Sequence, residues 1–197
     1  YSNEGRIAAT VTPKIIRLDE NRVNLVFEIT EGKVVEIERL AFVGNSLPRR
    51  CGIATFTTDL HAAMRHSRSE VDSFIVAMND RDGGYEYPPS VRLGIRDDAI
   101  GDYRRAASEL NALDVDAVSL QHEFGIFGGR AGSHILAFLD EVAAPIVTTL
   151  HTVLARPNAA QHDMIRRIAA RSARVVVMAE RGRELLNAAY GVQTSKV

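Results

Sequence analysis

Residues 117–129 read AVSLQHEFGIFGG and form the most informative segment of the chain. It begins with a short, mostly apolar run (117–120) of the kind found in strands that are buried on both faces. Two adjacent ionisable residues, His122 and Glu123, follow the run, and an apolar, glycine-rich loop comes after them. The stretch therefore predicts a buried strand that ends in a loop suited to function.

The same pattern repeats along the chain from about Leu40. Apolar runs lie at 40–43, 74–78, 91–95, 117–120, 146–150 and 175–178. Between them, helical spacing links apolar residues in four sets: Phe56, Leu60, Ala63 and Met64; Ile100, Tyr103, Ala107 and Leu110; Ile165, Ile168 and Ala169; Leu185, Leu186 and Ala189. Alternating strands and helices predict an α/β fold with a doubly wound, mostly parallel sheet covered on both faces. Ligands of such sheets bind beyond the carboxyl ends of the strands.

Residues 1–45 have a different pattern, with a period of two. Val23, Leu25, Phe27 and Ile29 share one face of a strand, and Ile7, Ala9 and Val11 alternate in the same way upstream. Turn-forming residues at 19–21 separate the two runs, which predicts an antiparallel hairpin. A third strand is expected over 34–43. We therefore expect a β-hairpin unit over residues 1–39 and a Rossmann-like domain over residues 40–197.

Composition favours a soluble globular protein. The 197 residues are 46% hydrophobic and 25% charged, with a net charge of −1. That balance gives no electrostatic field for nucleic acid or an anionic membrane. A single cysteine, Cys51, agrees with a reducing compartment, and no apolar run reaches the roughly 18 residues that span a bilayer. We expect a cytoplasmic location.

The loop after the first parallel strand carries Gly52 and Ile53 at the start of a predicted helix. A glycine there lets backbone N–H groups approach an anion, and the helix dipole favours negative charge. A structural left-handed turn explains Gly52 equally well. Neither G-x-G-x-x-G nor G-x-x-x-x-G-K-[ST] occurs, which disfavours an NAD dehydrogenase and a P-loop NTPase.

The loop after the run 117–120 would expose Phe124, Ile126 and Phe127, followed by Gly128 and Gly129. Exposed apolar side chains at this place indicate a lid or a ligand that covers them. The alternative is that the phenylalanines fold back into the core while His122 caps the strand. Taken as a whole, the segment favours function.

His151 follows the run 146–150 and is expected at the same edge of the sheet as His122. A histidine there suits hydrogen bonding to a sugar hydroxyl or phosphate, or stabilising positive charge on a sugar ring; a purely structural histidine is the alternative. A zinc site from His122, Glu123 and His151 is disfavoured, because the spacing H-E-x-x-H and a cysteine pair are both absent. We expect no metal and no cofactor.

Four segments in order resemble glycosyltransferase family 4: LPRRCGIATFT (47–57), SLQHEFGIFGG (119–129), VTTLHTVL (147–154) and ARVVVMAERGRELL (173–186). The resemblance covers about residues 40–197. It implies the N-terminal, acceptor-side half of a GT-B enzyme that transfers a hexose from a nucleotide-sugar with retention. The C-terminal half, which would hold the donor, is expected to be missing, so that the chain alone is inactive. The partners implied are the nucleotide-sugar, a sugar or glycan acceptor and that second domain, but no nucleic acid.

Site residues follow from this resemblance. Gly52, with Ile53 beside it, matches the glycine of the loop near the donor phosphate. His151 matches the histidine that faces the donor sugar, and is the expected catalytic residue. His122, Glu123 and Phe124 match the loop that lines the acceptor cleft, and Gly128 and Gly129 end that loop.

Residues 1–32 and the segment VVEIERLAFVGN (34–45) resemble part of a POTRA repeat of the outer-membrane protein assembly factor. That family binds extended polypeptides by adding strands to a sheet edge in the periplasm. The alternative function is therefore a polypeptide-binding fragment whose hairpin edge takes a peptide strand. The two resemblances belong to different compartments, so we interpret the chain as a chimera.

Overall fold

The computed structural model describes residues 10–17, 23–30 and 36–197. The chain divides into two compact units, Tyr1–Ile37 and Glu38–Val197. None of the helices described is both long and apolar enough to cross a membrane.

The first unit contains the expected antiparallel hairpin. Strand β1 (Thr10–Arg17) pairs with β2 (Val23–Thr30) in continuous register from Thr10 opposite Thr30 to Arg17 opposite Val23. The alternation places Ile7 and Ala9 in the first strand together with Val11, which β1 contains. Those two residues and the predicted turn at 19–21 lie outside the described residues.

The second unit is built on a six-stranded sheet in which every neighbouring pair is parallel. The strand order is β5-β4-β3-β6-β7-β8. The strands are β3 (Arg39–Gly44), β4 (Asp72–Asn79), β5 (Val91–Arg96), β6 (Ala117–His122), β7 (Ile146–Leu150) and β8 (Arg174–Val177). The order reverses between β3 and β6, because β4 and β5 extend the sheet on one side and β7 and β8 on the other. The predicted doubly wound α/β fold is confirmed.

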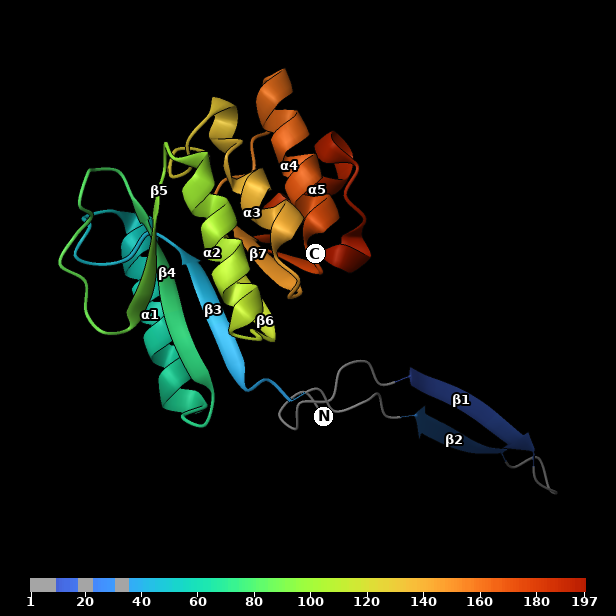
Figure 1. The fold of residues 1–197 in the computed structure, drawn as a ribbon. Coiled ribbons are helices and arrows are strands. Elements are labelled where there is room, and N and C mark those ends of the chain that lie inside the picture. Colours follow the sequence, from blue (N-terminus) through green and yellow to red (C-terminus); the bar gives the residue numbers. More distant parts are fainter. Residues whose placement is uncertain (1–9, 18–22, 31–35) are drawn as a thin grey trace. The chain divides into compact units, whose positions relative to one another are not determined.

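Helices cover the sheet on both faces (Figure 1). They are α1 (Gly52–Ser67), α2 (Ile100–Ala112), α3 (Ile135–Glu141), α4 (Ala159–Arg171) and α5 (Glu180–Tyr190). Helix α1 packs on β3 and β4, while α2, α3 and α4 pack against one another in turn. Alternate residues of β3 point to opposite faces of the sheet. Ala41 and Val43 belong to the core under α2 and α3, whereas the Phe42 ring meets the ring of His61 of α1 edge-on, with centroids 5.4 Å apart. Burial on both faces explains why the strands read as apolar runs.

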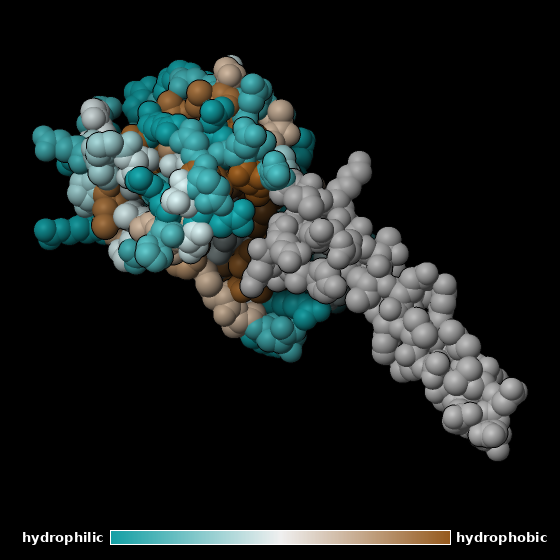
Figure 2. Space-filling model, turned by 90° about the horizontal axis from the view of Figure 1, so that it is seen from below, coloured by the Kyte–Doolittle hydropathy of each residue, from teal (hydrophilic) through white to brown (hydrophobic). Residues whose placement is uncertain are grey.

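The face of the second unit seen in Figure 2 is mostly hydrophilic, and its apolar residues lie in several separate places. Two apolar side chains stand out by exposure at the edge strand: Val176 is 43% and Met178 55% exposed. Met178 lies just after β8, so the predicted run 175–178 ends one residue too late.

The strand expected over 34–43 is shorter than predicted. Residues 36–38 are not in a strand, and β3 begins at Arg39. The Asp116 carboxylate accepts the backbone N–H of Glu38 at 2.9 Å and that of Arg39 at 2.8 Å. Both neighbouring strands also begin here, since Arg39 lies opposite Asp72 and Leu40 opposite Ala117. An aspartate thus takes the place of a neighbouring strand as the hydrogen-bond partner.

Candidate functional site

The carboxyl ends of β3, β6 and β7 lie side by side at the point where the strand order reverses. In open α/β sheets this is where two loops diverge and leave a crevice. Gly52 follows β3 and opens α1, His122 ends β6, and His151 follows β7. The backbone N–H of His151 donates to the His122 carbonyl at 3.0 Å. The structure therefore brings the three predicted positions to one edge of one sheet.

Gly52 is the first residue of α1 and is exposed. Its φ is not positive, so the alternative of a left-handed turn is wrong. A methyl group at this position would meet nothing within 4 Å. Cys51 precedes it as the helix cap, with its Sγ accepting the Ala54 N–H at 3.4 Å. The first residue of α1 is therefore exposed and unobstructed.

The loop between β3 and α1 is held by side chains that the sequence patterns did not single out. Asn45, which is fully buried, donates to the Cys51 Sγ at 3.2 Å and accepts from Arg49 at 3.1 Å. Arg49 also pairs with Asp80 after β4, at 3.1 Å. These contacts fix the loop, so that the first turn of α1 keeps its position.

His122 is fully buried, and neither of its ring nitrogens has a hydrogen-bond partner among the described residues. Its ring stacks on Phe127 with centroids 5.8 Å apart and meets Phe124 edge-on at 5.2 Å. Burial first, and then the nearby His151, lower the pKa of His122 to about 3. The imidazole is therefore neutral at neutral pH.

The expectation that Ile126 and Phe127 are exposed is wrong. Both are buried, at 5% and 4% exposure, because the loop folds back under the His122 ring. Phe124 is half-buried. Of the three apolar side chains, only Phe124 keeps surface that a ligand could cover.

Gly128 and Gly129 are packed against protein. A Cβ on Gly128 would lie 2.0 Å from the Asp97 carbonyl oxygen, and one on Gly129 would lie 2.4 Å from the Ser133 Oγ. The Gly128 N–H donates to the Tyr103 hydroxyl at 3.2 Å, and that hydroxyl donates to the Asp97 carbonyl at 2.9 Å. Close packing thus accounts for both glycines, whose part in substrate binding stays a prediction.

Glu123 joins two loops. One carboxylate oxygen accepts the Phe124 N–H at 2.9 Å, and the other accepts the hydroxyl of Thr152 in the loop after β7. His151 Nε2 is engaged separately, with Gln121. Within the part of the chain that the structure describes, His122, Glu123 and His151 do not form a group able to hold a metal ion.

His151 is half-buried and held from two sides. Its Nε2 lies 3.1 Å from the Oε1 of Gln121, and its ring meets Phe56 of α1 edge-on at 4.8 Å. Burial lowers the pKa of His151, and the Glu123 charge opposes that shift only in part. A neutral imidazole at this edge can exchange hydrogen bonds with an uncharged group such as a sugar hydroxyl.

No protein-family model and no curated protein matches the chain. Among solved structures, the chain is similar to one described as an alpha-glucosyltransferase in complex with UDP and a 13-mer DNA containing a central A:G mismatch. The TM-score is 0.48 and the sequence identity 12%; the similarity covers 71% of this chain and 38% of that chain. The likeness concerns the arrangement of strands and helices, and this chain spans well under half the length of that protein.

Proposed function

We propose that residues 38–197 form the acceptor-side domain of a retaining nucleotide-sugar glycosyltransferase. The observation that carries the proposal is the meeting of Gly52, His122 and His151 at the carboxyl edge of β3, β6 and β7, where the strand order reverses. The order of the four glycosyltransferase-like segments agrees with it. In this proposal a second Rossmann-like domain holds the nucleotide of the donor, and no metal takes part.

Each residue then has a chemical task. The backbone N–H groups at the start of α1 face the phosphate of the donor, because a helix N-terminus favours anions. His151, neutral because it is half-buried, hydrogen-bonds a hydroxyl of the transferred sugar. The half-buried Phe124 offers an apolar surface to a sugar ring, and Glu123 keeps the two loops in register through Thr152.

The test is a two-dimensional NMR titration of the full chain with UDP-glucose, glucose 1-phosphate and glucose, beside NAD as a dinucleotide. We expect saturable shifts of the amides of Gly52, Ile53, His151 and residues 122–125 with the sugar ligands. His151→Ala should weaken that binding at least tenfold, about the loss of one buried hydrogen bond. His66→Ala is the matched control, since His66 is exposed near the far end of α1. Saturation by NAD alone, or shifts remote from this edge, would contradict the proposal.

A second candidate function concerns the hairpin. Its two eight-residue strands form a two-stranded sheet, and no third strand pairs with either one among the described residues. Unpaired edges of this length are suited to strand addition by an extended polypeptide. Titration with a synthetic peptide of residues 23–30 should shift the amides of β2 or β1, while a peptide with a central proline should not. Unshifted amides in both strands would remove this candidate.

A further inference from the structure

Gln121 occupies an unusual position for an amide side chain. It lies within β6 and is fully buried. The apolar Val118 and Leu120 of the same strand point to the other face of the sheet, into the core under α2 and α3. Its side chain turns instead to the face of α1, where Gly44 of β3 makes room for it: a Cβ on Gly44 would lie 2.9 Å from the Cβ of Gln121. Burying an amide costs free energy unless its oxygen and its nitrogen are hydrogen-bonded, so a partner is expected for each.

Both ends of the amide are engaged. The Nε2 of Gln121 donates to the Ser119 Oγ at 3.0 Å, and its Oε1 lies 3.1 Å from the Nε2 of His151. An amide oxygen can only accept, so His151 must carry its proton on Nε2. A neutral imidazole has a single N–H, and the Nδ1 of His151 is therefore left with a lone pair. Among residues 36–197, Nδ1 has no hydrogen-bond partner.

The ring has little freedom to escape this arrangement. The backbone of His151 is tied to β6 through its N–H bond to the His122 carbonyl, and the Phe56 ring stands against the imidazole. In many sites, a hydrogen bond to the far nitrogen of a functional histidine selects one tautomer of its ring.

We propose that Gln121 is a positioning residue that fixes His151 as its Nε2–H tautomer, so that Nδ1 acts only as an acceptor toward the ligand. The group that meets His151 must then donate a hydrogen bond. A sugar hydroxyl fulfils this condition, and an unprotonated phosphate oxygen does not. The identity of the ligand rests on the proposed function, whereas the tautomer is a property of the free protein.

The first test is a long-range ¹H–¹⁵N spectrum of the histidine rings in the full chain at pH 8, with the His151 signals assigned by their loss in His151→Gln. We expect a protonated Nε2 and an unprotonated Nδ1. If the Gln121 amide were reversed, with Ser119 donating to Oε1, the proton would sit on Nδ1. That result would overturn the proposal without any variant being needed.

The second test uses variants at and beside Gln121. Gln121→Leu should lower the ratio of the Nε2–H to the Nδ1–H tautomer about fivefold, the worth of one neutral hydrogen bond. Gln121→Glu should raise the pH at which the His151 ring titrates, because a carboxylate beside an imidazole favours its charged form. Ser119→Ala is the matched control: it removes the other partner of the amide and should leave the tautomer unchanged. An unaltered ratio in Gln121→Leu would show that the amide does not set the tautomer.

Ligand polarity is tested with glucose and inorganic phosphate as probes. Glucose should shift the His151 Nδ1 resonance, and phosphate should leave it in place. A shift with phosphate alone would overturn the acceptor role. If the tautomer is as expected but no sugar or nucleotide-sugar binds at this edge, the proposed function fails while the role of Gln121 stands. Sugar binding with a proton on Nδ1 would instead support the proposed function and overturn the role of Gln121.

Discussion

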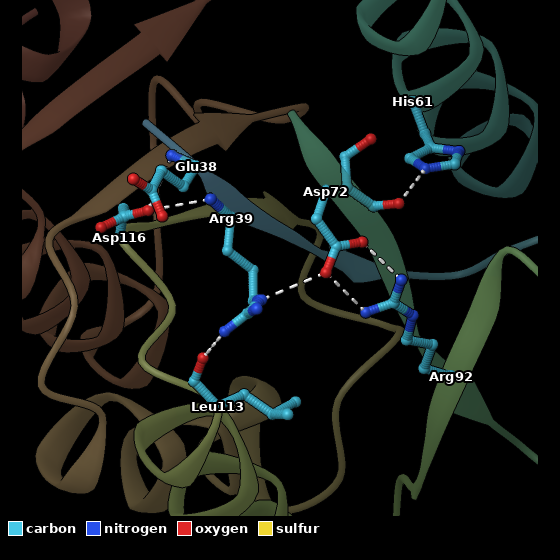
Figure 3. A network of polar contacts seen from close by, with 8 residues as sticks. Glu38, Arg39, His61, Asp72, Arg92, Leu113 and Asp116 are labelled. Carbon is cyan, nitrogen blue, oxygen red and sulfur yellow. Dashed lines mark hydrogen bonds and ion pairs between the residues drawn. The ribbon is translucent and has the colours of Figure 1, made fainter. Parts of the chain in front are cut away.

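The two edges of the six-stranded sheet differ in how their charged and histidine side chains are hydrogen-bonded. At the amino edge, charged side chains pair with one another (Figure 3): Arg39 donates to Asp72 and to the Leu113 carbonyl, and Arg92 pairs with Asp72 through both terminal nitrogens. Among the described residues of this edge, the buried Ser73 hydroxyl is left without a partner. At the carboxyl edge, both ring nitrogens of His122 and the Nδ1 of His151 have no partner among the described residues. For the buried His122 ring, hydrogen-bonding capacity that stays unused costs stability. We infer from this contrast that the amino edge stabilises the fold, whereas the carboxyl edge leaves histidine ring nitrogens available to a ligand.

The largest effect is expected where the carboxyl edge is itself packed. Gly128→Ala places a methyl group 2.0 Å from the Asp97 carbonyl oxygen, a backbone atom that cannot rotate away. We expect a loss of about 3 kcal/mol or more in the free energy of unfolding, measured by urea denaturation. Gly52→Ala is the matched control at the same edge, because its methyl group meets nothing within 4 Å. It should leave stability equal or raise it by about 0.5 kcal/mol. An equal loss in the free energy of unfolding in both variants would show that Gly128 is not packed more tightly than Gly52.

The second prediction concerns acid. The pKa of His122 is lowered from 6.5 to about 3, so above pH 6.5 the ring is neutral in both the folded and the unfolded chain. As the pH falls from 6.5 towards 3, only the unfolded chain takes up the proton. The free energy of unfolding should therefore drop by about 1.4 kcal/mol per pH unit in this window.

Urea denaturation at pH 7.5, 6.5, 5.5 and 4.5 measures this slope. His122→Gln should lose most of it and keep the smaller part that comes from His151, whose pKa burial also lowers. His66→Ala, at an exposed position on α1, should keep the whole slope. A slope that is the same in His122→Gln would mean that the buried ring is not the acid-sensitive group.

Much of this architecture could be predicted from the sequence, because strands buried on both faces read as apolar runs. Crossover handedness then fixes a doubly wound sheet. The packing around the predicted site residues could be predicted only in part. The sequence around Gly128 does not show whether a glycine is needed there for close packing or for the approach of a ligand. The burial of Phe127 depends on its stacking with the His122 ring, which no local pattern predicts. The role of Gln121 was missed, although a polar residue within a buried strand was the available signal.

The amino edge was missed for a different reason. Asp116 lies just before β6, yet it closes the start of β3, 78 residues away from Glu38 along the chain. Local patterns contain no information about such a contact. The start of β3 coincides with this contact, since Asp116 accepts the N–H of Glu38, the residue just before the strand, and that of Arg39, its first residue.

The third prediction tests that aspartate. Asp116→Ala leaves the N–H groups of Glu38 and Arg39 without their acceptor and should cost about 2 kcal/mol, or about 1 for each hydrogen bond. Asp163→Ala is the control, because its contact with Arg167 is an exposed pair at 4.0 Å and should be worth less than about 0.5 kcal/mol. If sugars bind at the carboxyl edge as proposed, the amide shifts that they induce should be the same in Asp116→Ala as in the unaltered chain. Weakened sugar binding in this variant would show that the two edges are coupled.

The smallest effect is expected at the exposed part of the amino edge. The hydrogen bond from Arg92 holds the pKa of Asp72 below its ordinary 3.8, and Arg39 adds to this. The resulting stabilisation is fully present above pH 3.8 and is lost as the pH falls through the lowered pKa. Because the Asp72 side chain is 40% exposed, solvent screening limits the contribution to less than about 1 kcal/mol.

Carboxylate NMR shows this effect more directly than denaturation does. Arg92→Gln should raise the pKa of Asp72 toward 3.8, and added salt should reduce the difference between the two proteins. Arg105→Gln serves as the control, since its guanidinium pairs with Asp102 and should leave Asp72 unchanged. A pKa of Asp72 that does not respond to Arg92→Gln would mean that the ion pair drawn in Figure 3 does not set the charge state of this carboxylate. The contrast between the two edges would then rest on Asp116 alone.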